Sequence, residues 1–131
     1  MAEISAGEVL AAAALAALEK VAGFNGVYEG APVKGSLPYA TIEIGPASDW
    51  SWKGGEGREV RLAVTIYEAG EKPARLRRLM AAVEGVLLGM SGGDTGWRIV
   101  NVVMVRARTM QKRAGDWVGT VEVRVRIERE G

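Results

Sequence analysis

Cysteine and histidine are both absent from the 131-residue sequence. Without cysteine the chain cannot form a disulfide framework or a thiolate metal site, a composition that fits a reducing compartment. Without histidine it lacks the commonest general base, the commonest metal ligand and the side chain that titrates near neutral pH. Chemistry by carboxylates or lysine is still possible. The two absences together nevertheless argue against an enzyme and against a bound metal or cofactor.

Net charge is also small, because 17 basic residues are balanced by 16 acidic ones to leave a formal charge of +1 at pH 7. Attraction of the whole molecule to nucleic acid or to an anionic membrane is therefore not expected, although a local basic patch is possible. The apolar run at residues 9–18 is too short to cross a bilayer. It also follows acidic rather than basic residues, unlike a signal peptide. We expect no membrane partner.

A hydrophobic fraction of 48% is sufficient for a buried core, and a chain of this length suits one domain over residues 1–131. Two helices are predicted from apolar residues spaced three and four apart. The first begins at a capping box formed by Ser5 and Glu8 and continues to about residue 22. It buries one face and ends before Gly23; that face consists of Leu10, Ala14, Leu18 and Val21. The second begins near Pro73 and ends at Gly89 or in the serine-glycine run that follows.

Alternating apolar and polar residues predict strands at residues 39–45, 58–68, 97–109 and 117–128, and allow a short edge strand at residues 27–28. Apolar residues occupy both faces at the start of the 97–109 strand, which predicts a central position for it. A turn near Ala114 would join the last two strands so that residues of equal parity pair throughout. Arg106 should then lie opposite Glu122.

The expected fold is therefore α+β, in the order helix, two or three strands, helix, two strands. Because short links join consecutive strands, the simplest arrangement is a mainly antiparallel sheet of four to five strands with two helices packed on one face.

Residues 46–57 form the most unusual local segment, a long glycine-rich connection that contains Trp50 and Trp52. Tryptophan is enriched among the residues that contribute most to binding at interfaces. We predict that this loop contacts a partner through the two rings and the charged residues around them, which are Asp49, Lys53, Glu56 and Arg58. The alternative is that at least one ring folds back on its own sheet.

Two other interpretations of this segment are weaker. Residues 54–57 lack the lysine and hydroxyl of a phosphate-binding loop and lead into a strand rather than a helix. Asp49 and Glu56 could act as a metal-binding or acid–base pair, but one loop supplies no third ligand. We expect these carboxylates to be exposed or paired with Lys53 and Arg58.

The last two strands are rich in arginine. Arg106, Arg108, Arg124 and Arg126, with Lys112 and Arg113, could form a patch that binds phosphates. Glutamates alternate with them at positions 122, 128 and 130, so a solvated face of mixed charge is the favoured interpretation. Contact with another protein chain is a third, in which alternating charges would set the register.

An ordered set of short segments spans residues 6–128. The set consists of the alanine- and leucine-rich first helix, Pro38-Tyr39-Ala40-Thr41 with Ile44-Gly45, Asp49-Trp50-Ser51 with Lys53, Gly57-Arg58-Glu59-Val60, Val64-Thr65-Ile66-Tyr67, the 76–88 helix and Gly119-Thr120-Val121-Glu122. In this order the chain resembles the small tail-completion proteins, or tail terminators, of long-tailed phages and phage-like gene transfer agents. One departure is Tyr67, where tryptophan is expected to be common.

The resemblance implies a structural virion protein without catalytic residues. Such proteins form a ring, usually of six copies, on the head-proximal end of the tail tube. The ring stops polymerisation of the tube protein, contacts the head-side connector and lets DNA pass through its opening without specific binding. The expected location is the virion tail or neck, after assembly in the cytoplasm of the bacterial host.

A ring needs two different surfaces on each subunit. The second face of the sheet, the tryptophan loop and the exposed side of the first helix are candidates. A small nucleic-acid-binding module that uses the arginine-bearing strands is the alternative function. A hydrolase using Asp49 and Glu56 is the least favoured.

Overall fold

The computed structural model describes residues 4–130. Residues 1–3 and 131 of the expected domain lie outside this range. The elements are α1 (Ala6–Leu18), β1 (Gly26–Glu29), β2 (Tyr39–Asp49), β3 (Gly57–Ala69), α2 (Ala74–Leu88), β4 (Trp97–Arg113) and β5 (Asp116–Arg129). Their order confirms the predicted one, including the short edge strand.

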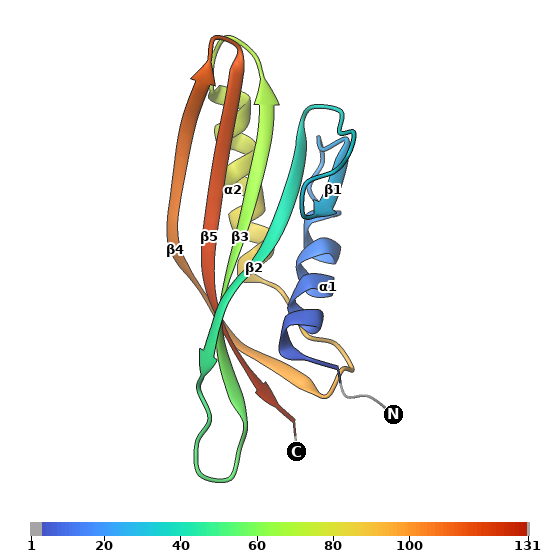
Figure 1. Cartoon of the computed structure of the whole chain (residues 1–131), viewed down its shortest axis with the longest axis vertical. Helices are drawn as coiled ribbons and strands as arrows, with labels where there is room; N and C mark the ends of the chain where they lie inside the picture. Colours follow the sequence, from blue (N-terminus) through green and yellow to red (C-terminus); the bar gives the residue numbers. More distant parts are fainter. Residues whose placement is uncertain (1–3, 131) are drawn as a thin grey trace.

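The five strands form one twisted sheet in the order β1-β2-β3-β5-β4, in which only the β1–β2 pair is parallel. Both helices lie on one face of it, α1 against β1 and β2 and α2 against the other three strands (Figure 1). The predicted α+β class is confirmed. The opposite face of the sheet carries no layer from the described chain, and we call it the open face.

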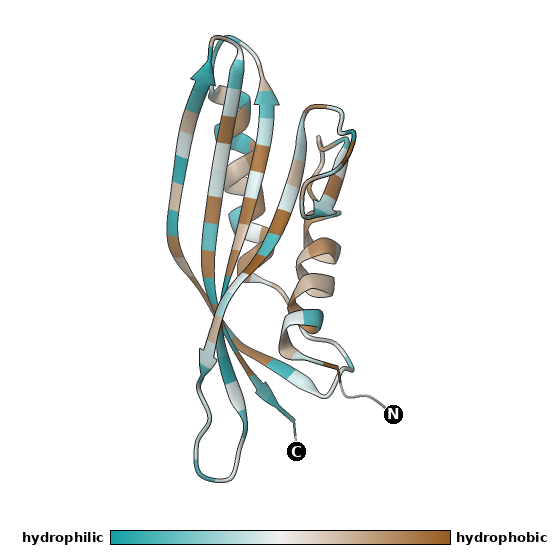
Figure 2. Ribbon diagram, in the orientation of Figure 1, coloured by the Kyte–Doolittle hydropathy of each residue, from teal (hydrophilic) through white to brown (hydrophobic). Residues whose placement is uncertain are grey.

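The core lies between the helices and the sheet, and its composition follows from the alternation along the two central strands. Val60, Leu62, Val64 and Ile66 of β3 and Val121, Val123, Val125 and Ile127 of β5 are all fully buried. The same alternation gives the bands of colour along these strands in Figure 2. A side-chain period of two places every second residue on the helix side, as predicted.

The first helix starts as predicted but ends earlier. The Ser5 hydroxyl oxygen accepts a hydrogen bond from the Glu8 backbone N–H at 3.1 Å. The helix stops at Leu18 rather than near residue 22, because the N–H groups of Lys20 and Val21 bond three residues back instead of four. The tighter turn still brings Val21 into the core. The second helix ends at Gly89, as predicted.

The predicted central position of β4 is wrong, since β4 forms one edge of the sheet. Its register on β5 shifts between Ile99 and Asn101 and again between Met104 and Arg106. Between the two shifts residues of unlike parity pair, so the predicted equal parity fails there, and Val103 is turned toward the open face. The second shift restores the expected register. Arg106 lies opposite Glu122, as predicted.

Candidate partner-contact surfaces

The tryptophan segment is an ordered hairpin rather than the predicted twelve-residue loop. Strand β2 continues to Asp49, and the Trp50 N–H donates to the Gly57 carbonyl at 3.0 Å. Trp52 and Gly55 exchange two backbone hydrogen bonds of 3.1 and 3.0 Å, so the chain reverses at Lys53 and Gly54. Gly54 has a φ of +98°, which glycine adopts without a steric penalty. We call residues 49–58 the arm, and Figure 1 shows it projecting beyond the rest of the sheet.

The two tryptophans of the arm have different environments. Trp50 is half-buried and stacks under the guanidinium of Arg126, whose Cζ lies 5.1 Å from the ring centre. Trp52 contacts Trp50 edge to face, with ring centres 6.1 Å apart, and it is 49% exposed. Its indole lies against Gly55, where an added Cβ would come within 2.2 Å of the ring. Trp50 therefore folds back on its own sheet, and Trp52 is the ring presented to solvent.

The carboxylates of the arm are held in ion pairs. Arg58 reaches Asp49 at 3.4 Å and Glu56 at 3.3 Å, whereas Lys53 makes no ion pair within residues 4–130. Hydrogen bonds from the Ser51 hydroxyl and backbone N–H lower the pKa of Asp49, and Arg58 adds a smaller electrostatic contribution. The described part of the chain contains no group of three or more acidic residues arranged to hold a metal ion.

Replacing Ser51 with alanine should raise the pKa of Asp49 toward its ordinary value, because the largest cause of the lowered value is removed. Because folding lowers the pKa of the Asp49 carboxyl, this group stabilises the folded state fully at pH values above its unfolded pKa. The stabilisation is lost as the pH falls through the lowered pKa of the folded state. Titration of the Asp49 carboxyl carbon by NMR measures the shift. Ser48→Ala is the matched control. An unchanged Asp49 titration in Ser51→Ala would show that the hydroxyl does not act as described.

The arginines of the open face are largely neutralised by shared glutamates. Glu122 on β5 bridges Arg61 of β3 at 3.0 Å and Arg106 of β4 at 3.2 Å. Glu59 of β3 similarly receives Arg124 at 3.6 Å and Arg126 at 3.1 Å. The face is therefore one of mixed charge, as the favoured interpretation predicted. Of the four arginines singled out in the sequence, only Arg108 makes no ion pair within residues 4–130.

These contacts unite most of the predicted contact residues. Arg126 links the arm to the open face, because it stacks on Trp50 and pairs with Glu59. Arg108 lies apart, since it is opposite Thr120, which is four residues from Arg124 along β5.

A row of tyrosines on the open face was not singled out from the sequence. Tyr39 of β2 stacks on Tyr67 of β3 with ring centres 4.7 Å apart and meets Tyr28 of β1 edge to face at 6.0 Å. Val118 and Met110 continue the row across β5 and β4 by register. The row could have been found from the strand parities, because it requires only the pairing of positions on the same face.

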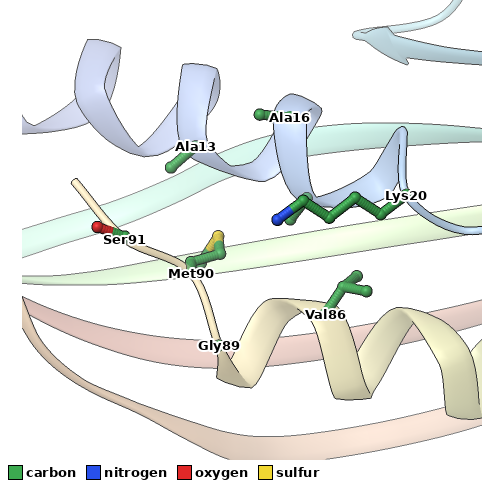
Figure 3. Close-up of a pocket in the computed structure, with 8 residues that line it drawn as sticks. Ala13, Ala16, Lys20, Val86, Gly89, Met90 and Ser91 are labelled. Atoms are coloured by element: carbon green, nitrogen blue, oxygen red, sulfur yellow. The ribbon is translucent and has the colours of Figure 1, made fainter. Parts of the chain in front are cut away.

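A groove of about 310 Å³ separates the two helices. It is lined by small residues of α1 and by Val86, Met90 and Ser91. Figure 3 shows the Lys20 side chain lying along α1 with its amine directed into this groove. Neither helix of the described range is both long enough and apolar enough to cross a bilayer.

The chain is thus an α+β domain with an open, mixed-charge sheet face and a projecting aromatic arm. The sequence matches the family "Tail completion protein gp17" over residues 8–128, and the chain belongs to this family. The predicted relationship to tail-completion proteins is confirmed, and the protein is a structural tail protein.

Among solved structures, a chain of the "Virion of native gene transfer agent (GTA) particle" has the same fold. It superposes with a TM-score of 0.72 at 24% sequence identity, covering 89% of this chain and 92% of that chain. No curated protein matches the sequence.

Proposed function

We propose that this protein is a tail terminator that forms a ring, of six copies as the resemblance implies, at the head-proximal end of the tail tube. There it ends polymerisation of the tube protein and joins the tail to the head-side connector. The observation that carries this proposal is the family match over residues 8–128, which extends from the first turn of α1 to the end of β5. The same fold in a chain of a gene transfer agent virion supports it.

The proposed contacts along the tail axis use the arm. Trp52 is exposed at its end, and Asp49, Glu56 and Arg58 hold one another beside it. A rigid, half-exposed tryptophan on an ordered hairpin loses little conformational freedom on binding, which favours tight contact per unit area. The arm therefore suits contact with the tube protein or the connector, and Lys53 at the turn adds one cation for that contact.

The open face suits a surface past which DNA moves without being retained. Four of its arginines are matched by the shared glutamates Glu59 and Glu122. Neutralised cations release few counterions from DNA and therefore bind it weakly. The proposed location is the neck of the virion, after assembly in the host cytoplasm.

Replacing both shared glutamates, in the variant Glu59→Gln/Glu122→Gln, should create retention of DNA. Arg61, Arg106, Arg124 and Arg126 would lose their carboxylate partners, and affinity for duplex DNA at 50 mM salt should rise by about tenfold or more. Anisotropy of a labelled duplex measures this, and the gain should disappear by 200 mM salt. Glu19→Gln/Glu84→Gln carries the same charge change on the two helices and should bind as the unmodified protein does. Equal affinity in all three proteins would contradict this role of the glutamates.

Particles assembled without this protein test the proposal directly. Electron microscopy should show overlong tails, or finished tails of normal length that do not attach to heads. Normal, joined and infectious or transducing particles in its absence would overturn the assignment.

A small nucleic-acid-binding module is the second candidate, and the observation in its favour is Arg108, which lies on an arginine-rich strand and has no ionic partner among the described residues. A stable monomer that binds DNA tightly at moderate salt would support it over the ring. The pairing of the other four arginines of that predicted patch argues against it.

A further inference from the structure

The two edges of the sheet differ in charge. Strand β4, at one edge, contains five basic residues and no acidic one. Three of the five are paired within the chain, to Glu128, Glu122 and Asp116. Arg108 and Lys112 have no ionic partner within residues 4–130. This edge of the sheet therefore presents two cations that no carboxylate of the described chain neutralises.

The same strand exposes apolar side chains. Val103, Val105 and Met110 are 42%, 39% and 41% exposed, and no strand of the described chain lies on the outer side of β4. Exposed apolar residues on an open edge usually mark a contact surface. Three register shifts interrupt β4, between residues 99 and 101, 104 and 106, and 111 and 113. These irregularities work against continuous strand addition, so contact through side chains is the mode that fits. We call Val103, Val105, Arg108, Met110 and Lys112 the basic edge.

The other edge of the sheet has a groove that carries negative rather than positive charge. It lies between α1 and the strands β1 and β2, with a volume of about 490 Å³. Its apolar lining includes Ala11, Ala12, Leu15 and Ile44, and its carboxylates are Glu8 and Glu29. No basic residue lines it, and neither carboxylate is ion-paired within the described range. We call these six residues the acidic groove.

We propose that the basic edge of one copy docks against the acidic groove of a second copy. Arg108 and Lys112 then face Glu8 and Glu29, and the exposed valines and Met110 cover the apolar part of the groove. Complementary charge selects the partner and sets the register, and the buried apolar side chains supply most of the affinity.

This contact rests on the proposed ring and deepens it by naming the two surfaces that each subunit uses. The basic edge and the acidic groove lie on opposite sides of the molecule (Figure 1). A contact between two different surfaces leaves one of each free after every addition. It therefore propagates from copy to copy and ends only when a ring closes.

Charge reversal on each surface tests the contact. Glu8→Lys/Glu29→Lys disables only the groove, and Arg108→Glu/Lys112→Glu disables only the edge. Because each change turns an attraction into a repulsion, each variant should self-associate about a hundredfold more weakly than the unmodified protein and sediment as a monomer. An equimolar mixture of the two should form dimers and nothing larger, since one intact edge meets one intact groove. The protein with all four changes should recover the full oligomer.

Controls separate misfolding from loss of contact. Thermal melts verify that each variant is folded, and Glu8→Gln/Glu29→Gln, which changes the side chains least, should weaken association in the same direction. Lys53→Glu reverses an exposed charge on the arm and should leave the oligomer intact.

The outcomes distinguish this contact from the ring itself. If the unmodified protein is monomeric at all concentrations in solution and is present as single subunits in assembled tails, both the contact and the ring are overturned. An unmodified oligomer whose two single-surface variants remain oligomeric would overturn the contact and leave the ring. The contact would also be overturned if Arg108→Glu/Lys112→Glu kept the oligomer but abolished retention of duplex DNA, because the edge would then be a nucleic-acid surface.

Discussion

Replacing Trp97 with alanine should lower the free energy of unfolding by about 4 kcal/mol, the cost typical of deleting a buried aromatic ring. Trp97 is 2% exposed at the start of β4. Its indole N–H donates to the Ile4 carbonyl at 2.9 Å, and the Arg129 guanidinium lies 4.6 Å from the ring centre. The ring thus ties the segment before α1 to the end of the β4–β5 pair that lies farthest from their hairpin turn. Chemical denaturation followed by far-UV circular dichroism measures the loss, and the melting temperature should fall by roughly 15 °C.

Trp97→Phe separates the two contributions of this side chain. It keeps most of the buried ring but leaves the Ile4 carbonyl without its donor, so the cost should be about 1–2 kcal/mol. A loss below about 1 kcal/mol in Trp97→Ala would show that the ring is not the link that its contacts indicate.

Trp52→Ala, in contrast to Trp97→Ala, should cause little loss of stability and a large loss of tails joined to heads. Half of the Trp52 surface is already exposed, so its removal should cost less than about 1.5 kcal/mol of folding free energy. If the arm makes the proposed axial contact, losing a central tryptophan weakens that contact by at least about 2 kcal/mol in each subunit. Around a ring these losses combine, and the number of joined tails should fall by about a hundredfold or more. Complementation of particles that lack the protein, counted by electron microscopy, provides the measurement.

Trp50→Ala is the matched comparison on the same arm. Trp50 stacks under Arg126 and contributes to folding of the arm, so its loss should be visible in thermal melts as well as in tails. Joined tails at the normal level with Trp52→Ala would mean that the arm does not contact a partner through that ring. The self-association of Trp52→Ala should remain normal, which places its defect outside the contact between copies.

The sequence was most informative where one physical requirement controls each residue. Strands β3 and β5 lie in the centre of the sheet with helices on one side only, so every second residue must be apolar. Val64 and Val121 obey that rule together with their neighbours. The stripe on α2 follows for the same reason. These elements were sufficient to predict the class of fold and the order of its parts.

The errors arose where local irregularity breaks the period of two. Apolar residues on both faces of β4 indicated a central strand, but register shifts around residues 100 and 105 produce the same pattern at an edge. The shifts depend on pairing with β5, which no window of one strand reveals. Gly54 and Gly55 are typical of loops and therefore predict one, although here Lys53 and Gly54 form a two-residue turn and Gly55 accommodates an indole.

For the contact surfaces, it was easier to predict which residues take part than which other residues each of them touches. Trp52 and the arginines stand out in the sequence, and the Arg106–Glu122 pair followed from register alone. That Trp50 would meet Arg126 was not predictable, because the strands that carry them are brought together only by the sheet. The acidic groove combines a helix and two strands that are distant in sequence, and for the same reason it left no local signal.

The placement of β3 has a mechanical consequence. This strand bears the arm at one end and is followed by α2 at the other, and it is hydrogen-bonded along its length on both sides. Both β2 and β3 enter the arm, so a force along it moves these two strands together and is carried as shear through the β3–β5 ladder, whose backbone bonds yield together rather than one at a time. A partner bound to the arm would therefore tilt the sheet as one rigid unit. The displacement would reach the opposite end of the subunit, because no flexible linker separates the arm from the sheet.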